Sequence, residues 1–363
     1  MATPDLSIPF KPHPKEPRAE PVCVVSLNAS DAYSWDAFVR AHPTGTFFHQ
    51  LGWKRVIEST YGYEPRYLCA KRGDRITGIA PAFIVSSWLT GVCLISLPFA
   101  VYGGVCAEDV ESENALISGL EQLASDVRAQ YMELRTRQGA LRPGYYANDH
   151  YATFTLPLSS DIEAVYKALP KDARYMIRKA EKACLHARQG LDQIDLLYDL
   201  MSVNLRRLGT PAFSRRLFRN LISEYPNQVD ITIVYAGDEP IAGGMSFFFR
   251  EWMQPYYVGS KEKAKALAGN DFLWWQLIKL AATTGHSVFD FGRSKTQSGN
   301  YEFKKKWGPS IEPLNYQLRL VESKNVPEFR QSSRKFQMAT KVWSKIPLTL
   351  TKVIGPRVVR WFP

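Results

Sequence analysis

The sequence has few of the residues that build metal centres and disulfide frameworks. It contains five cysteines, an odd number with no Cys-x-x-Cys pair, and six scattered histidines without the spacing of zinc ligands. Cys69, Cys93 and Cys106 stand in apolar runs typical of strands. We therefore expect free, buried thiols in a reducing compartment, and no metal.

The N-terminus lacks the apolar core of an export signal. Residues 1–21 are rich in proline and in charge, which predicts a disordered lead-in. Without such a signal, we expect the body of the protein to be cytoplasmic.

Charge is absent from one long stretch. Residues 76–107 contain no charged side chain across 32 positions, a length sufficient to cross a bilayer. Pro81, Gly91 and Pro98 interrupt the stretch and divide it into pieces of strand length. The pattern favours buried strands over a transmembrane helix.

Positive charge, by contrast, is concentrated near the C-terminus. The 363 residues carry a net charge of +11, and residues 324–363 hold nine Lys or Arg but one acid, Glu328. The length predicts two domains or two fused halves. The uneven charge indicates an anionic partner such as a membrane surface or a nucleic acid.

The chain repeats one order of elements. Each half reads as a strand hairpin, a strand, a helix and a strand, with matching turns at Gly73-Asp74 and Gly237-Asp238. We place the first half at 22–160 and the second, which carries the candidate site, at 161–323. A helical insertion at about 192–224 precedes the second hairpin, and residues 324–363 form an extension.

A basic helix is predicted between the halves, in "LPKDARYMIRKAEKACLHAR" at 169–188. Tyr175, Met176 and Ala180 recur at helical spacing, and a cationic face opposes them. Two interpretations stay open: this face is simply solvated, or Arg174 and Arg178, one turn apart, bind phosphate.

A second cationic motif is "FDFGRSKTQSGNYEFKKKWGP", residues 289–309. An apolar strand stops at Gly292, and three lysines follow between aromatic residues. This combination favours a pocket for an anionic substrate, although the lysines could also be solvated loop charges. Its candidate site residues are Asp290, Arg293, Lys295, Tyr301, Phe303, Lys304, Lys305, Lys306 and Trp307.

Acyl transfer to an amine would suit these residues. Negative charge develops on the carbonyl oxygen, and one fixed donor there is worth roughly 3–4 kcal/mol. We assign that role to Lys304, and assign substrate phosphate to Lys305 or Lys306 because neighbours in an extended segment face opposite sides. Asp290 either orients the amine or acts as a base, or else pairs with a nearby cation.

The other assignments in this motif are less specific. Arg293 binds a phosphate or carboxylate, or forms a structural ion pair. Tyr257, in the "QPYYVGS" strand, forms a wall of the site. The sequence shows no recognisable Ser-His-Asp or Cys-His arrangement, and direct attack by an amine does not require such a nucleophile.

These motifs together carry a family resemblance. "LPKDARYMIRKAEKACL", "QPYYVGS", "NDFLWW" and "FDFGRSKTQSGNYEFKKKWG" resemble the Fem-like aminoacyltransferases over about residues 21–320. The likeness is closest to the branch associated with exosortase and PEP-CTERM exopolysaccharide systems. It implies an α+β fold of tandem GNAT-like, or twin acetyltransferase-like, halves.

The resemblance also implies an activity. Members of that family transfer an amino acid from aminoacyl-tRNA to an amine of a lipid- or nucleotide-linked peptidoglycan precursor. It gives Tyr301, Phe303, Lys304 and Lys305 a place at the acceptor and reaction site, and gives a phosphate or substrate role to Arg174, Arg178 and Lys179. We expect an N-acyltransferase of cell-envelope or exopolysaccharide precursors, with a small-molecule or lipid-linked saccharide or peptide as acceptor.

The donor stays open between aminoacyl-tRNA and acyl-CoA, with no tightly bound cofactor. The sequence lacks the long paired-helix arm that some family members use for tRNA, and "RRLGTP" at 206–211 matches only part of a coenzyme A loop. The alternative is a non-catalytic protein of the same fold that binds polyanionic or lipid-linked saccharide.

The C-terminal extension predicts two amphipathic helices. Apolar residues including Val342, Trp343 and Val353 recur near helical spacing among lysines and arginines. Such a pattern suits peripheral contact with an anionic membrane, here the inner face of the cytoplasmic membrane. Packing of the apolar stripe on the protein body is the alternative.

Overall fold

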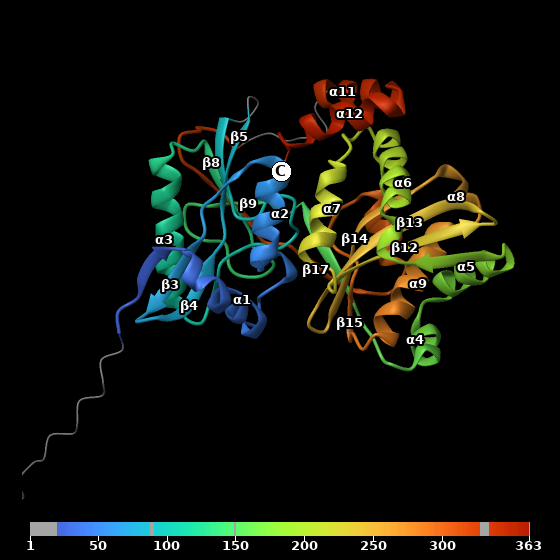
Figure 1. The fold of residues 1–363 in the computed structure, drawn as a ribbon, viewed down its shortest axis with the longest axis horizontal. Coiled ribbons are helices and arrows are strands. Elements are labelled where there is room, and N and C mark those ends of the chain that lie inside the picture. Colours follow the sequence, from blue (N-terminus) through green and yellow to red (C-terminus); the bar gives the residue numbers. More distant parts are fainter. Residues whose placement is uncertain (1–19, 88–90, 149, 327–333, 363) are drawn as a thin grey trace, which may run out of the picture.

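The computed structural model describes residues 20–87, 91–148, 150–326 and 334–362. The two halves lie side by side along the long axis, and the C-terminal helices cover one end of the second half (Figure 1). The predicted lead-in at 1–21 lies almost wholly outside the described residues.

The first half combines short strands with three α-helices. Its strands are β1 (Cys23–Ser26), β2 (Glu64–Pro65), β3 (Leu68–Arg72), β4 (Arg75–Ala80), β5 (Phe83–Ser87), β6 (Gly91–Ile95), β7 (Cys106–Ala107), β8 (Tyr131–Arg135) and β9 (Tyr146–Asn148). Its helices are α1 (Ala32–Ala41), α2 (Leu51–Tyr61) and α3 (Val110–Asp126).

The second half has longer strands and more helices. Its strands are β10 (Tyr151–Pro157), β11 (Leu185–Gln189), β12 (Val229–Ala236), β13 (Glu239–Phe249), β14 (Trp252–Ser260), β15 (Val288–Asp290), β16 (Ser294–Lys295) and β17 (Ser310–Pro313). Its helices are α4 (Ile162–Ala168), α5 (Lys171–Lys182), α6 (Ile194–Arg207), α7 (Arg215–Glu224), α8 (Glu262–Ala266), α9 (Gly269–Thr283) and α10 (Gly299–Lys305). The chain ends with β18 (Tyr316–Leu320), α11 (Arg334–Lys345) and α12 (Leu348–Val359).

The predicted repetition of elements is present. The hairpins β3–β4 and β12–β13 turn at the two predicted Gly-Asp pairs. Helix α3 returns the chain to β8, parallel to β6, and helix α9 returns it to β15, parallel to β14. The α+β fold of tandem GNAT-like halves is therefore confirmed.

The halves exchange strands. The sheet orders are β1-β3-β4-β7, β2-β5-β6-β8-β18-β9 and β11-β12-β13-β14-β15-β10-β16, with β17 beside β10. Strand β10 precedes residue 160 but belongs to the second half's sheet, whereas β18 returns to β8 and β9 of the first half. The sheets therefore do not divide at the predicted boundary of 160.

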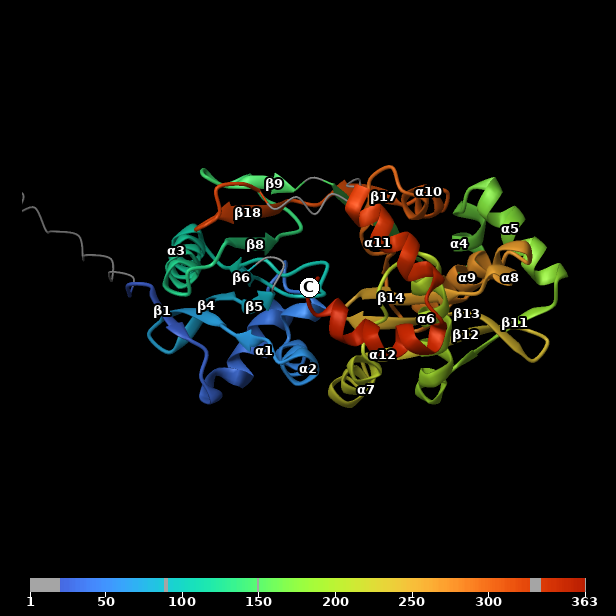
Figure 2. The ribbon, with the colours of Figure 1, turned by 90° about the horizontal axis from the view of Figure 1, so that it is seen from above.

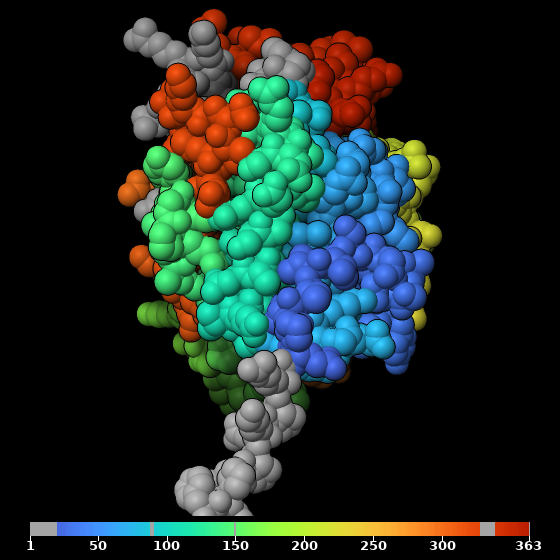
Figure 3. All heavy atoms as spheres, turned by 90° about the vertical axis from the view of Figure 1, so that its left-hand side faces the viewer, coloured from blue at the N-terminus to red at the C-terminus, as the bar shows by residue number. Residues whose placement is uncertain are grey.

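The returning segment is visible on the outer face of the first half. In Figure 3 the orange residues of the late chain lie against the teal helix α3. Arg319 of β18 pairs with Glu121 of α3 at 2.5 Å. Strands β10 and β18 therefore connect the two halves through their sheets.

The charge-free stretch forms β4 to β7, as the strand prediction requires. Ile79, Phe83 and Cys93 are fully buried in it. Among the described residues, no helix is both long enough and apolar enough to cross a bilayer.

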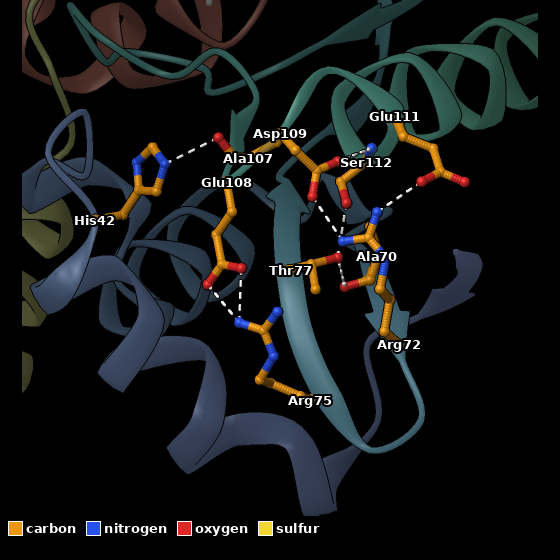
Figure 4. Close-up of polar contacts among 10 residues, drawn as sticks. All are labelled: His42, Ala70, Arg72, Arg75, Thr77, Ala107, Glu108, Asp109, Glu111 and Ser112. Carbon is orange, nitrogen blue, oxygen red and sulfur yellow. Dashed lines mark hydrogen bonds and ion pairs between the residues drawn. The ribbon is translucent and has the colours of Figure 1, made fainter. Parts of the chain in front are cut away.

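An ion-pair cluster fixes helix α3 to the first hairpin (Figure 4). Arg72 at the end of β3 reaches Asp109 at 2.6 Å and Glu111 at 2.7 Å. Asp109 also caps the helix by accepting from Ser112 N, and the Arg72 guanidinium holds the pKa of Asp109 well below its usual range. Helix α3 leads into β8, so these ion pairs also help to position β8, the strand with which β18 pairs.

Aromatic packing joins the two halves at their seam. Phe47 of the first half stacks on Phe247 of β13, with ring centroids 4.3 Å apart. Arg250, at the tip of the β13–β14 hairpin, donates to the carbonyls of Arg40, His42, Pro43 and Gly45. The loop at 43–49 is therefore held rigidly against the second half.

Candidate active site

A cavity of about 320 Å³ lies between the two halves. Its first-half lining comes from residues 43–49, 102–106 and 136–138; its second-half lining is Phe247, Phe249, Arg250, Trp252, Gln254 and Asp290. Cavities at domain seams with aromatic walls and few polar groups are typical of small-ligand sites. Among the sequence-predicted site residues, Asp290 alone lines it.

Asp290 supplies the buried carboxylate of this cavity. It ends β15 and is 2% exposed. Its Oδ2 accepts from Tyr102 Oη at 2.8 Å and Gln254 Nε2 at 2.9 Å, and its Oδ1 accepts from Gly292 N at 2.7 Å and Thr153 Oγ1 at 3.1 Å. Burial raises the pKa of Asp290, although the hydrogen bonds from Tyr102 and Gly292 oppose the shift.

The side chains of Asp290, Tyr102 and Thr153 form a closed triangle of contacts, in which Tyr102 meets Oδ2 and Thr153 meets Oδ1 of the carboxylate. The two hydroxyl oxygens are 2.5 Å apart, in addition to their bonds to the carboxylate. While Asp290 is ionised, the two hydroxyl groups supply only two protons for the three oxygen–oxygen contacts. A third proton would allow all three contacts to be hydrogen bonds at the same time.

Arg137 places a positive charge beside this triangle. Its guanidinium lies 4.7 Å from the Trp252 ring centroid and 5.4 Å from that of Tyr102. It pairs with Glu312 at 3.2 Å, and its Nε is buried without a partner among the described residues. Arg137 also lowers the pKa of Asp290, which keeps the carboxylate ionised more readily.

Lys304 lies behind the cavity rather than in it. It is 9% exposed, and its Nζ donates to the carbonyls of Gly292 and Arg293, each at 2.9 Å. Burial lowers its pKa to about 7. Gly292 turns the chain with a φ of 69°, so Lys304 fixes the turn that immediately follows Asp290.

The lysine block is helical, which corrects the extended segment expected from the sequence. Helix α10 begins after Ser298, whose side chain accepts from Tyr301 N at 3.2 Å. The strand alternation used to assign Lys305 and Lys306 therefore does not apply. Lys305 is exposed, and Lys306 pairs with Asp271 of α9 at 2.6 Å.

The aromatic residues of this block pack inside the second half. Trp307 is fully buried in the core of the second half, and Phe303 and Tyr301 pack against that core. The Tyr301 ring meets Phe154 edge-on at 5.0 Å. None of the three lines the cavity.

Arg293, Lys295 and Tyr257 also lie outside the cavity lining. Arg293 stacks between Tyr151 at 4.7 Å and Tyr316 at 5.6 Å, which joins β10 to β18 by cation–π contacts. Lys295 is half-buried on β16. Tyr257 is 4% exposed and packs on Phe218 with centroids 5.0 Å apart.

The basic helix α5 contributes no residue to the cavity. Arg178 and Lys179 are exposed, Arg174 is half-buried, and the helix packs on α9 at the far end of the second half (Figure 1). Pro170, just before the helix, packs against Gly308, just after the lysine block. The basic helix and the lysine block are therefore neighbours, and neither contributes a residue to the cavity lining.

His49 and Cys106 form a neutral pair in the cavity wall. His49 Nδ1 accepts from Thr46 N at 3.2 Å, which leaves Nε2–H to face Gly104 O at 3.0 Å and Cys106 Sγ at 3.4 Å. Burial lowers the pKa of His49 to about 4 and raises that of Cys106 to about 12. The pair is thus no thiolate–imidazolium nucleophile.

The sequence predicts buried thiols and no metal site. Cys69, Cys93 and Cys106 are buried thiols, and Cys23 and Cys184 are exposed thiols. No group of three or more His, Cys, Asp or Glu side chains in the described residues is arranged to hold a metal ion.

Comparison with known proteins supports this fold. Residues 170–305 match the family model described as an acetyltransferase (GNAT) domain. The chain is similar to the crystal structure of FemX, at 14% identity and a TM-score of 0.61, covering 82% of this chain and 97% of FemX. The fold is that of a tandem GNAT protein.

Two further structures share this tandem arrangement. A tandem GNAT protein from the clavulanic acid biosynthesis pathway is 9% identical, with a TM-score of 0.53 over 84% of this chain and all of that one. The C-terminal domain of a putative lysylphosphatidylglycerol synthetase from Agrobacterium fabrum is 12% identical, with a TM-score of 0.53 over 82% and 92%. No curated protein sequence matches the chain.

Proposed function

We propose that the protein is a Fem-like N-acyltransferase that moves an aminoacyl or acyl group to an amine of a cell-envelope or exopolysaccharide precursor. The observation that carries this proposal is the buried Asp290–Tyr102–Thr153 triangle, which borders a cavity between the two halves. An exosortase-associated role rests on the motif resemblance alone.

In the proposed reaction, the acceptor amine enters the cavity and attacks the carbonyl carbon of the donor. A C–N bond forms, and the C–O bond of an aminoacyl ester or the C–S bond of a thioester breaks. The amine loses a proton to the Asp290 triangle, and the leaving oxygen or sulfur takes up that proton and departs as the free hydroxyl or thiol, which returns Asp290 to its ionised form. Arg137, which carries a buried and unpaired Nε, is placed to stabilise negative charge developing in the cavity.

Lys304 takes a positioning role in this proposal. Its ammonium holds the Gly292–Arg293 turn, so it fixes the backbone amide that Gly292 donates to Asp290. The sequence-based assignment had Lys304 contacting the oxyanion itself. Its absence from the cavity lining favours the indirect role.

The cavity size limits what the acceptor places inside it. A volume of about 320 Å³ is at the lower end for small-molecule sites, and suits a single sugar or amino-acid unit. Phe47, Phe249 and Trp252 provide flat apolar surfaces for a sugar ring. The remainder of a lipid-linked acceptor would extend outside the cavity.

The partial coenzyme A loop in the sequence lies next to the C-terminal extension. Gly209 of "RRLGTP" lies against Thr340 of α11, and Arg206 donates to Ile346 O at 2.6 Å. Gly209 and Arg206 therefore contact the C-terminal extension, whereas Arg207, Leu208 and Thr210 stay exposed, and these contacts make the segment a poor match for a pyrophosphate loop. We accordingly favour aminoacyl-tRNA as donor and keep acyl-CoA as the alternative.

One observation supports a second candidate, a non-catalytic binding protein. Asp290 already accepts four hydrogen bonds, which is the full capacity of a carboxylate. A carboxylate with this environment also suits a rigid binding site for a saccharide.

Transfer assays distinguish these candidates. The purified protein is incubated with a bacterial lipid-linked precursor extract and either charged bulk tRNA or acetyl-CoA, each labelled in the acyl group. Label that enters the extract and survives mild base is in an amide, because the donor esters hydrolyse. Catalysis is supported if Asp290→Asn abolishes incorporation and the matched exposed control Asp126→Asn retains it. Binding of precursor without incorporation from either donor supports the second candidate.

A further inference from the structure

The C-terminal helices α11 and α12 each have one face on the protein body. Thr351, Gly355 and Val359 of α12 are buried, and Gly355 packs against Ala212. Lys352 pairs with Asp199 of α6 at 2.7 Å. The sequence alternative of packing on the body is therefore realised for this face.

The opposite face of each helix carries an exposed stripe. On α11 the exposed residues Met338, Lys341, Val342 and Lys345 follow the spacing i, i+3, i+4, i+7. On α12 the exposed residues Leu350, Val353, Ile354 and Arg357 follow the same spacing. This spacing places each set of four on one side of its helix.

Both stripes lie at the same end of the molecule. Helices α11 and α12 both contact α6, and they form the uppermost layer when the protein is seen from above (Figure 2). Because each helix has its inner face on the body, the two outer faces point away from it together. We call these eight exposed residues the C-terminal surface.

The C-terminal surface is unusually apolar for a solvent-exposed part of the protein. Val342 and Val353 are 62% and 61% exposed, and Met338 is 66% exposed. Of the sixteen large apolar residues exposed in the described chain, six lie between Met338 and Phe362. Clustering of this kind marks a contact surface rather than scattered surface residues.

Its charge is of one sign. Lys341, Lys345 and Arg357 lie within the stripes, and residues 329–363 contain no acid at all. Cations interleaved with aliphatic side chains are complementary to a partner that has both negative charges and apolar groups at its surface. Nucleic acid would match the charge but not the aliphatic residues, because it is bound through cations and aromatic stacking.

We propose that the C-terminal surface docks the protein on an anionic lipid bilayer, with both helices lying in the plane of the interface. Met338, Val342, Leu350, Val353 and Ile354 enter the boundary between headgroups and acyl chains, and the three cations contact lipid phosphates. The inner faces of α11 and α12 stay on the body, so the whole protein is held at the membrane.

Vesicle co-sedimentation of the full chain tests this proposal without any acyl donor, so its outcome is independent of the proposed reaction. Vesicles are made from phosphatidylcholine alone or from phosphatidylcholine and phosphatidylglycerol in equal parts. We expect the protein to pellet with the anionic vesicles, to stay in solution with the zwitterionic ones, and to be released by high salt.

Two variants separate the apolar and charged contributions. Val342→Ser/Val353→Ser should weaken binding at least tenfold, by an order-of-magnitude estimate from the lost apolar groups. Lys341→Gln/Lys345→Gln should weaken it about 30-fold, since each cation near an anionic surface contributes about 1 kcal/mol. The control Arg128→Gln/Arg188→Gln removes equal charge from exposed sites elsewhere and should leave binding within about twofold, the ordinary spread for surface substitutions.

Several results would overturn the proposal. These are failure of the wild-type protein to bind anionic vesicles, equal binding by the serine variant, and equal losses in the control. A stripe that instead binds bulk tRNA, with the glutamine variant weakening tRNA and not vesicles, would assign the surface to nucleic acid. A soluble dimer that the serine variant dissociates would assign it to a second copy of the chain.

Discussion

Tyr102 donates a hydrogen bond of 2.8 Å to Asp290 across 188 residues of sequence. The first residue belongs to the first half and the second ends a strand of the other half. Their meeting brings a buried carboxylate to the wall of the cavity between the halves. The proposed chemistry depends on this contact.

Replacing Tyr102 by Phe should alter the pH dependence of turnover. The Tyr102 hydroxyl lowers the pKa of Asp290, so its loss should raise that pKa further. A base is active when deprotonated, and the acidic limb of the rate profile should therefore move to higher pH. The profile of kcat for Tyr102→Phe and for the matched exposed control Tyr175→Phe measures this, and superimposable acidic limbs would argue against Asp290 as proton acceptor.

Lys304 should make stability depend on pH above neutrality. Its pKa is about 7 in the folded protein and near 10.5 in the unfolded chain, so the unfolded state holds an extra proton between these values. The free energy of unfolding should accordingly rise with pH across this window, by a few kcal/mol at most. Urea titrations at pH 7 and pH 10 should show a rise in wild type that Lys304→Met lacks.

The exposed neighbour provides the control for that measurement. Lys305→Met should keep the wild-type rise, because Lys305 lies at the surface. Equal pH dependence in wild type and Lys304→Met would show that the Lys304 ammonium is not destabilised by burial.

Arg250 should couple the halves at the cavity rim. Its guanidinium donates to four backbone carbonyls of the loop at 40–45. Arg250→Ala should lower the free energy of unfolding by about 1–3 kcal/mol and raise KM more than it lowers kcat. Arg250→Lys cannot span the four acceptors and should recover only part of the loss; full recovery by lysine would mean that charge alone matters.

Thiol labelling should distinguish two classes of cysteine. Cys23 and Cys184 are exposed, whereas burial raises the pKa of Cys69 and Cys106 to about 12. A water-soluble disulfide reagent should modify two thiols rapidly in the native protein and all five after denaturation. Rapid reaction of Cys106, identified by peptide mass, would mean that the cavity opens widely to solvent.

Local patterns in the sequence predict much of the fold. The two Gly-Asp turns locate both hairpins, and helical spacing locates α5 and the C-terminal helices. These features involve neighbours within a few turns, where periodicity and turn chemistry act directly. The sequence likewise predicts that the two helices of the extension are amphipathic, although not which of their faces meets the body.

Contacts between distant residues are what the sequence conceals. The exchange of β10 and β18 depends on pairing between strands far apart in the sequence, and Tyr102 lies in an apolar run without a catalytic motif. Arg137 and Thr153 carried no motif at all. The sequence predicts an extended segment for the lysine block because it follows a strand and a polar turn, whereas Ser298 is the residue that caps α10.

The most direct test of the central claim is a single-turnover measurement of label transfer, with precursor affinity measured alongside. Catalysis by the Asp290 triangle predicts that Asp290→Asn lowers the transfer rate by at least about 100-fold while precursor affinity changes only a few-fold. A transfer rate equal to that of the wild-type protein would contradict the account.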